Sequence, residues 1–246
     1  MSVTEFKLQY ETTDVTMSSG IPVIIAAGGS SLRMKGINKQ FAELLGVPVL
    51  ARTLLKFEEC PKISRIIIVT RPDSILPVQE LCQKYLITKV TDILEGGNNR
   101  HESVMNGFSR LSQDEKKVLI HDGARPLVNN ETILDVIDAL DNFDAAVCTV
   151  PVNDTVKLIT ADGTVDKTLD RTLIHMAQTP QGVDVFKYRQ ACETVDATQL
   201  TDDSAVMEAA GFRVAYTKGD KSNIKITTKE DIPLAEFYLK ENGLCE

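Results

Sequence analysis

The chain has 246 residues, and its 27 Lys and Arg against 35 Asp and Glu give a formal net charge of −8. Hydrophobic residues make up 43% and charged residues 25%, a balance that excludes a wholly disordered chain and allows one large or two small domains with a buried core. The acidic balance argues against a broad nucleic-acid-binding face, although it leaves room for a small basic pocket. No apolar run approaches the roughly 18 residues that a membrane span requires.

The N-terminal segment and the cysteines predict where the protein works. Residues 1–20 are polar and rich in Thr and Ser, and no basic stretch is followed by an apolar one, so we expect a flexible tail and not a secretory signal. The five cysteines lie far apart, without the C-x-x-C pair typical of zinc sites. We therefore expect a reduced, cytoplasmic protein that contacts neither nucleic acid nor membrane.

From residue 21 onward, apolar runs that are typical of buried strands alternate with helical patterns. We expect strands over 22–27, 65–70, 89–93, 117–121, 145–150 and 213–217, and helices over 49–57, 75–85, 103–111, 132–140, 203–211 and 231–239. Continuous apolar strands separated by helices indicate a parallel sheet that is covered on both faces. The sequence thus predicts an α/β fold in one domain over 21–246, with a doubly wound, Rossmann-like, mostly parallel sheet.

Residues 152–178 interrupt this alternation. Apolar and polar residues alternate from Thr155 to Ile159, and the Asp162-Gly163 pair favours a hairpin turn. A segment of this size has too little core to be ordered alone. We therefore expect a projecting β-arm that packs on a second copy of the chain, most simply in a two-fold homodimer.

A glycine-rich run, AAGGSSLRM, follows the first expected strand. Glycines let the backbone approach phosphate groups, and successive N–H groups can hold oxyanions. Arg33 and Lys39 add two cations that can converge on a polyphosphate. The run matches neither the P-loop nor the three-glycine dinucleotide pattern, and a tight strand-to-helix turn followed by solvated charges is the alternative interpretation.

Seven runs, in this order, resemble a known enzyme family. They are IIAAGGSSLRMKGINKQFAELLGVPVLARTL (24–54), GGNNRHESVMNG (96–107), HDGARP (121–126), PVNDTVK (151–157), LDRTLIHMAQTPQ (169–181), TDDSAVMEAAG (201–211) and NIKITTKED (223–231). Together they resemble the nucleotidylyltransferases that activate sugar and polyol phosphates and, among these, the 2-C-methyl-D-erythritol 4-phosphate cytidylyltransferase family. Ser30 or Ser31 stands where the family loop has its second Gly, and Asn38 stands where a Pro usually precedes the Lys.

The resemblance implies transfer of a cytidylyl group from CTP to 2-C-methyl-D-erythritol 4-phosphate in the non-mevalonate isoprenoid pathway. The products would be 4-diphosphocytidyl-2-C-methyl-D-erythritol and pyrophosphate. A phosphomonoester is largely a dianion at neutral pH and needs no general base, so the chemistry calls for cations that hold two polyanions together. The resemblance assigns this catalytic role to Arg33 and Lys39 at the transferring phosphate, and to Arg171 and Lys225 at the attacking one.

The resemblance also implies the binding residues. Nucleotide contacts fall on Ala26, Ala27, Gly28, Gly29, Gly97, Asn98 and Ser103, and substrate contacts fall on Asp122, Arg125 and Thr155. Asn98 replaces a residue that is often acidic. A loop before a Ser-capped helix is the alternative for the Gly97 segment, and a plain turn is the alternative for Asp122. Mg²⁺ or another divalent cation is implied, bound mainly through the CTP phosphates, with Asp122 as the one candidate protein ligand.

Two alternative functions remain open at this point. A sister enzyme that acts on D-ribitol 5-phosphate shares the nucleotide loop, HD-x-x-RP and Q-T-P-Q, although the position of Arg171 and the TDD run at 201–203 favour the methylerythritol enzyme. A non-catalytic nucleotide-binding module of the same fold would need no cation on the attacking side. The joint presence of all four catalytic cations argues against such a module.

Overall fold

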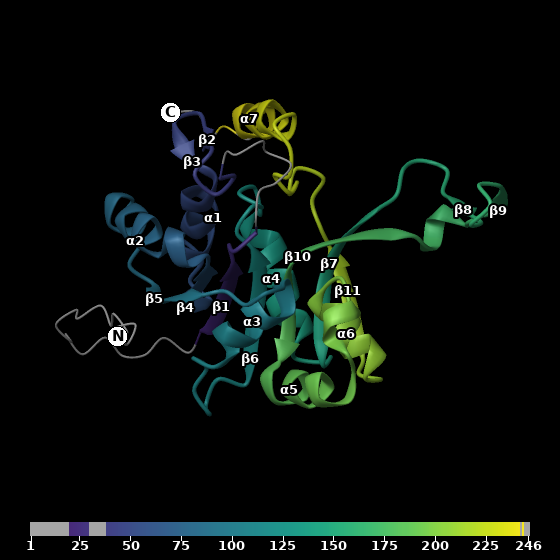
Figure 1. The fold of residues 1–246 in the computed structure, drawn as a ribbon, viewed down its shortest axis with the longest axis horizontal. Helices are drawn as coiled ribbons and strands as arrows, with labels where there is room; N and C mark the ends of the chain where they lie inside the picture. The colour runs from purple at the N-terminus through teal and green to yellow at the C-terminus, as the bar shows by residue number, and fades with distance from the viewer. Residues whose placement is uncertain (1–19, 30–37, 242, 244–246) are drawn as a thin grey trace.

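A seven-stranded sheet forms the centre of the molecule (Figure 1), in a computed structural model that describes residues 20–29, 38–241 and 243. In spatial order its strands are β11 (Val214–Lys218), β7 (Ala145–Pro151), β10 (His175–Asp184), β6 (Lys117–Asp122), β1 (Ile21–Ala26), β4 (Ile63–Thr70) and β5 (Val90–Glu95). β10 runs antiparallel to both of its neighbours, whereas the other pairs in the sheet are parallel. The expected mostly parallel sheet is therefore confirmed.

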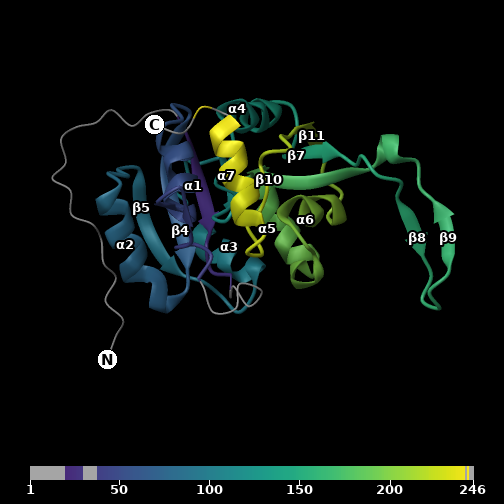
Figure 2. The ribbon, with the colours of Figure 1, turned by 90° about the horizontal axis from the view of Figure 1, so that it is seen from above.

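Helices cover both faces of this sheet (Figure 2). One face packs against α1 (Val49–Glu58), α2 (Ile75–Lys84) and α4 (Asn130–Ala139), and the other against α3 (Arg100–Phe108), α5 (Val185–Thr194) and α6 (Asp203–Ala209). The last helix, α7 (Asp231–Glu241), packs beside the short strands β2 (Glu43–Leu44) and β3 (Val47–Pro48). Within the part of the chain that the structure describes, no helix is long and apolar enough to cross a membrane.

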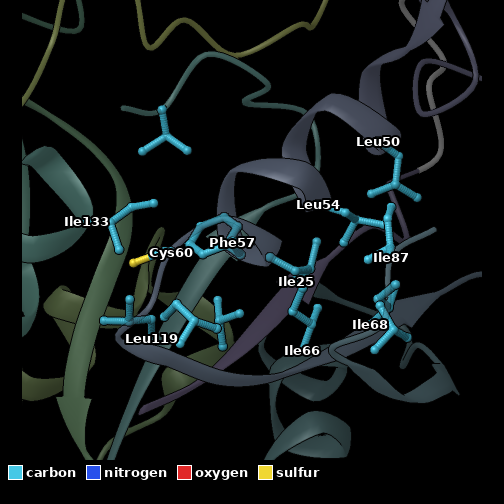
Figure 3. Close-up of a cluster of buried hydrophobic side chains, with 14 of the residues drawn as sticks. Ile25, Leu50, Leu54, Phe57, Cys60, Ile66, Ile68, Ile87, Leu119 and Ile133 are labelled. Atoms are coloured by element: carbon cyan, nitrogen blue, oxygen red, sulfur yellow. The ribbon is translucent and has the colours of Figure 1, made fainter. Parts of the chain in front are cut away.

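The two-sided cover explains why the central strands are apolar without interruption. Successive side chains of a strand point to opposite faces of the sheet. Ile25 therefore packs with Phe57 of α1 in the cluster that Figure 3 shows, while its neighbour Ile24 packs with Phe108 of α3 on the other face. Both isoleucines are fully buried, so each face of β1 contributes to a separate half of the core.

Among the strands of the central sheet and the helices that cover its faces, β10 and α5 are the two that the sequence analysis does not predict. β10 is buried near its centre although it carries Gln178, Thr179, Pro180 and Gln181 there. Hydrogen bonds compensate for the burial of these polar side chains. Gln178 Nε2 donates to the Asp220 carbonyl, and Gln181 Nε2 donates to a carboxylate oxygen of Asp202, the N-cap residue of α6. An apolar pattern cannot reveal a strand whose buried residues are satisfied by distant polar partners.

Residues 152–174 form a hairpin arm that extends away from the sheet in both views (Figures 1 and 2). Its strands β8 (Lys157–Ile159) and β9 (Val165–Thr168) pair antiparallel, and Gly163 in the turn has a φ of 85°, a conformation that glycine adopts without strain. Every residue of the two strands is exposed in the single chain. Residues 175–178, which the sequence analysis places in the arm, belong to β10, and 175–177 pair with β7.

Gly107 tests the close packing between α3 and β1. A Cβ at this position would lie 2.7 Å from Ile24 Cγ2 inside the buried core. Gly107→Ala should therefore lower the free energy of unfolding by about 1–3 kcal/mol, in spite of the better helix propensity of Ala. Urea denaturation measures this change. Glu193→Ala, at an exposed position of α5, is the control and should shift stability by less than about 0.5 kcal/mol; equal effects of the two substitutions would contradict the packing argument.

Candidate active site

The candidate site is a pocket at the edge of the sheet where the parallel strands β1, β5 and β6 end. The last residues of β1 and β6, Ala26 and Asp122, lie side by side in the strand register. Open α/β sheets bind their ligands at this edge. The pocket has a volume of about 370 Å³ and is lined by Ala26, Gly28, Gly29, Lys39, Gln40, Gly97, Asn98, Asn99, Arg100, Ser103, Asp122, Ala124 and Lys225.

The loop after β1 supplies one wall of the pocket. Gly28 and Gly29 line it, and a Cβ on Gly29 would lie 3.5 Å from the Lys39 ammonium nitrogen, so the lysine side chain passes close to the glycine backbone. Ala27 is buried beneath this wall, where its carbonyl accepts a hydrogen bond from Gln40 Nε2 at 3.3 Å. Arg33 lies outside the described residues. The glycines and one of the two expected cations therefore meet at the pocket.

Residues 96–99, which we call the base loop, supply the opposite wall. The Gly97 N–H donates to Ser103 Oγ at 3.1 Å, and that hydroxyl donates to the Asn99 carbonyl at 2.8 Å. Asn99 caps α3 by accepting from the Glu102 N–H, so Ser103 lies inside the helix, and the alternative of a helix capped by Ser103 is wrong. A Cβ on Gly97 would lie 2.2 Å from Glu102 Cβ, which makes a glycine necessary there.

Asp122 stands at the centre of a cluster of positive charges. Lys225 Nζ lies 2.8 Å from Asp122 Oδ2, Arg125 Nε lies 3.7 Å from the same oxygen, and Arg100 Nε lies 3.5 Å from Oδ1. Burial alone would raise the pKa of the Asp122 carboxyl, but Lys225 and Arg100 outweigh this effect and hold the pKa well below its usual range. The carboxylate therefore stays ionised.

Arg100 is a pocket residue that sequence reasoning missed. Its Nη2 donates to Asp203 Oδ2 at 2.7 Å. Burial lowers the pKa of Arg100, but the carboxylates of Asp203 and Asp122 outweigh it and raise the pKa above its usual value. Both partners of this ion pair stood in runs already singled out, GGNNRHESVMNG and TDDSAVMEAAG, yet nothing in a linear sequence shows that the two runs meet.

Arg125 and His121 lie behind the pocket. The Arg125 side chain is 12% exposed, does not line the cavity, and donates from Nη1 to the Asn223 carbonyl at 2.8 Å. This bond fastens the segment that carries Lys225 to the turn after β6. Burial lowers the pKa of His121 to about 4, so its ring is neutral at physiological pH. The ring forms hydrogen bonds with the Arg125 carbonyl and the Thr179 hydroxyl beside Asp122.

Thr155 and Arg171 both lie on the hairpin arm. Both side chains are exposed, and neither lines the pocket of its own chain. Arg171 Nη1 donates to the Asn153 carbonyl at 2.6 Å, which holds the guanidinium next to the segment that contains Thr155. The structure thus groups these two residues with each other and apart from the remaining described site residues.

The pocket has the chemistry of a polyanion-binding site. Among the described residues, its lining holds three cations, Lys39, Arg100 and Lys225, against the single carboxylate of Asp122, in a chain of net charge −8. The described residues contain no group of three or more His, Cys, Asp or Glu that could hold a metal ion by themselves. Glycine-rich walls, converging cations and a parallel-sheet edge are typical of a site that binds nucleotide phosphates, and the motifs that form this pocket resemble those of the nucleotidyltransferases.

Comparison with known proteins identifies the family within this class. The family model described as 2-C-methyl-D-erythritol 4-phosphate cytidylyltransferase, IspD, matches residues 21–241. A relative of that name from Clostridium novyi is 40% identical over 237 residues, which cover 93% of this chain and 100% of the relative. A further one, from Halalkalibacterium halodurans, is 40% identical over 89% of this chain and 96% of its own length. The chain belongs to this family.

Solved structures agree with the sequence relatives. The crystal structure of 4-diphosphocytidyl-2C-methyl-D-erythritol synthase from Anaerococcus prevotii superposes with a TM-score of 0.80 at 33% identity, covering 91% of this chain and 99% of the other. The cytidylyltransferase of the same family from Thermus thermophilus gives a TM-score of 0.72 at 27% identity, over 90% and 99% of the two chains. The enzyme class inferred from the fold and the pocket is therefore the class of its relatives.

Proposed function

We propose that this pocket transfers the cytidylyl group of CTP to 2-C-methyl-D-erythritol 4-phosphate, giving 4-diphosphocytidyl-2-C-methyl-D-erythritol and pyrophosphate. One observation carries the proposal: Lys39, Arg100 and Lys225 converge beside the base loop in a member of the cytidylyltransferase family. Three cations in one small pocket suit a reaction between two polyanions. The attacking phosphate is already largely a dianion at neutral pH, so this reaction needs no general base.

The base loop is the proposed cytosine site. Cytosine offers one amine donor and two acceptors, which backbone groups of Gly97 and Asn98 and the hydroxyl of Ser103 can read. Two hydrogen bonds hold the Ser103 hydroxyl against this loop: it accepts from the Gly97 N–H and donates to the Asn99 carbonyl. A preorganised loop of this kind selects a base by leaving a polar group unpaired with the wrong one.

The phosphate-binding cations divide into two groups. Lys39, lying over Gly29, would stabilise the transferring phosphate and the leaving pyrophosphate together with Arg33 of the same loop. Lys225 lies across the pocket on Asp122 and would hold the phosphate of the polyol. Asp122 and Arg125 would fix this side of the site, with Asp122 facing the polyol hydroxyls.

A divalent cation, Mg²⁺ by its preference for oxygen ligands, fits this donor set only with the help of the substrate. Asp122 is the one carboxylate that lines the described pocket, it stays ionised, and it is already paired with Lys225. Such an ion would be held mainly by the CTP phosphates, with Asp122 as its protein ligand. When bound, it would neutralise phosphate charge.

The hairpin arm would complete the site of a second subunit in a homodimer. Several of its apolar side chains are largely uncovered by the described part of the chain, since Leu158, Ile159, Val165 and Leu173 are between 43% and 79% exposed. An apolar arm of this kind is stable when it packs on a partner. Arg171 and Thr155 would then reach the phosphate and the polyol in the partner's pocket, where the planar guanidinium can grip phosphate with two hydrogen bonds.

We place the enzyme in the cytoplasm. Four of its cysteines, Cys60, Cys82, Cys148 and Cys192, are free thiols in the described part of the chain. Burial raises the pKa of Cys82 and Cys148 to about 12, so these thiols remain protonated and unreactive. Free, inert thiols are typical of a reducing compartment.

The direct test of the proposed function measures pyrophosphate release and identifies the nucleotide product by mass spectrometry. We expect turnover with CTP and 2-C-methyl-D-erythritol 4-phosphate, and kcat/KM lower by about a hundredfold or more when UTP replaces CTP. D-Ribitol 5-phosphate is the matched competitor for the polyol. Higher kcat/KM with the ribitol compound would assign the chain to the other reaction, and no product with either polyol would contradict the proposal.

The first loop supplies a second prediction. Lys39→Ala and Arg33→Ala should each lower kcat by about a hundredfold, because one preorganised charge contact to the transition state contributes about 3 kcal/mol. The KM for the polyol phosphate should change much less, since both cations are assigned to the nucleotide side. Steady-state kinetics of the two variants provide the measurement, and kcat within threefold of wild type for both would contradict the assignment.

The arm supplies a third prediction, on mixed dimers. Lys39 belongs to the pocket and Arg171 to the arm, so a dimer of one Lys39→Ala and one Arg171→Ala subunit would hold one doubly damaged site and one intact site. With free subunit exchange, the mixture of the two inactive variants should recover about a quarter of wild-type activity. The activity is measured before and after exchange.

Two outcomes would contradict the crossed arm. A mixture that remains inactive after verified subunit exchange means that each arm serves its own pocket. A wild-type protein that is monomeric by analytical ultracentrifugation means that no partner pocket exists. Mixing Lys39→Ala with Lys225→Ala is the control, because both lesions then lie in the same pocket: the mixed dimer has no intact site and should gain no activity.

A further inference from the structure

Arg100 connects the base loop with the carboxylate at the end of β6. It is the first residue of α3, directly after the base loop, and its side chain lines the pocket. Its Nε lies 3.5 Å from Asp122 Oδ1, and its Nη2 lies 2.7 Å from Asp203 Oδ2. Arg100 therefore bridges two carboxylates that belong to different elements, β6 and α6.

The Asp203 end of this bridge is fixed. The Asp203 side chain is only 2% exposed, and its second oxygen accepts a hydrogen bond from Tyr188 Oη at 2.9 Å. Tyr188 is fully buried and stacks on Phe108 of α3, with ring centroids 4.7 Å apart. With both oxygens occupied in a packed interior, the Asp203 carboxylate holds the planar fork of Arg100 in one orientation.

The Asp122 end of the bridge is the one that faces substrate. Arg100 takes Oδ1, which leaves Oδ2 for Lys225 at 2.8 Å. The orientation of the carboxylate thus decides where the Lys225 ammonium lies in the pocket. Asp203 does not line the pocket, so it can act on this arrangement only through Arg100.

We propose that Arg100 is a positioning residue: anchored on Asp203, it fixes the Asp122 carboxylate so that Lys225 is aimed at the phosphate of the polyol substrate. The inference rests on the proposed function, because it takes that phosphate as the ligand of Lys225. It differs from a direct role of Arg100 on the nucleotide. A direct contact to the nucleotide would raise the KM for CTP, whereas positioning of Lys225 affects the reaction of the polyol phosphate.

The experiment compares Arg100→Lys with Asp203→Asn. The lysine keeps the charge but cannot contact both carboxylates at once, and the asparagine keeps the shape of the anchor but removes its charge. Each variant should lower kcat/KM for the polyol phosphate by about 10- to 100-fold, since small misplacements of a positioned group have effects of this size. The KM for CTP should stay within about threefold, and the double variant should be no worse than Arg100→Lys, because the two residues act as a unit.

Arg110→Lys is the matched control. Arg110 lies just beyond α3 and pairs with Asp92 at 3.8 Å outside the pocket, so this variant should keep wild-type kinetics. Thermal unfolding and circular dichroism establish that each variant is folded. Tyr188→Phe removes one hydrogen bond from Asp203 and is a milder change to the same anchor. If Asp203→Asn does not fold, the effect of Tyr188→Phe on kcat/KM for the polyol phosphate tests whether the anchor matters.

Three results would overturn the inference. Wild-type kinetics in folded Asp203→Asn would show that the anchor is irrelevant. A rise in the KM for CTP that exceeds the loss with the polyol phosphate would show that Arg100 contacts the nucleotide. A wild-type protein without product from CTP and the polyol phosphate would contradict the proposed function and this inference together, whereas active wild type with unaffected variants contradicts this inference alone.

Discussion

The site depends on one buried carboxylate that remains charged. Asp122 ends the central strand β6 with its side chain 10% exposed, a position in which an unpaired charge would be strongly unfavourable. Three cations compensate for it, and they come from three separate places: the start of α3, the turn after β6 and the segment before α7. Ionic contacts to Asp122 thus connect the base loop with the C-terminal third of the chain.

This arrangement allows the pocket to exist before any ligand arrives. Cations brought close together repel one another, and a permanent carboxylate between them reduces that repulsion. The segment with Lys225 is also fixed by hydrogen bonds, since the Ile226 N–H donates to the Ala124 carbonyl and Asn223 Nδ2 donates to the Thr179 carbonyl. A site whose charges are fixed in advance needs little reorganisation during reaction, which is where electrostatic catalysis gains its advantage.

The sequence predicts the parts of the fold that depend on local apolar patterns, and it does not predict the parts that depend on polar contacts between distant residues. The apolar strands such as β1 and β4 and the amphipathic helices between them were predicted to within a few residues, because their burial is encoded in local patterns. β10 escaped prediction because hydrogen bonds from Gln178 and Gln181 take the place of apolar burial. The bridge of Arg100 to Asp203 joins residues 103 positions apart, and no periodicity reports a contact of that separation.

Most of the residues predicted for the candidate site come from the family resemblance, and the residue patterns alone do not identify them. Lys39, Lys225 and Asp122 meet in one pocket as the motifs imply, although the motifs give no distances. Thr155 and Arg171 lie on the arm, away from the described pocket lining of their own chain. Arg33 lies outside the described residues, so its place in the pocket remains a prediction of the sequence.

Asn98, where the family often has an acidic residue, has a physical explanation in the base loop. The carboxylate of Glu102 accepts hydrogen bonds from the Asn98 N–H at 2.8 Å and from Asn98 Nδ2 at 2.9 Å, both at Oε2. An aspartate at position 98 would place a second negative charge against this oxygen and could not donate the side-chain hydrogen bond. Glu102 thus places a negative charge in the first turn of α3, where the positive end of the helix dipole stabilises a carboxylate.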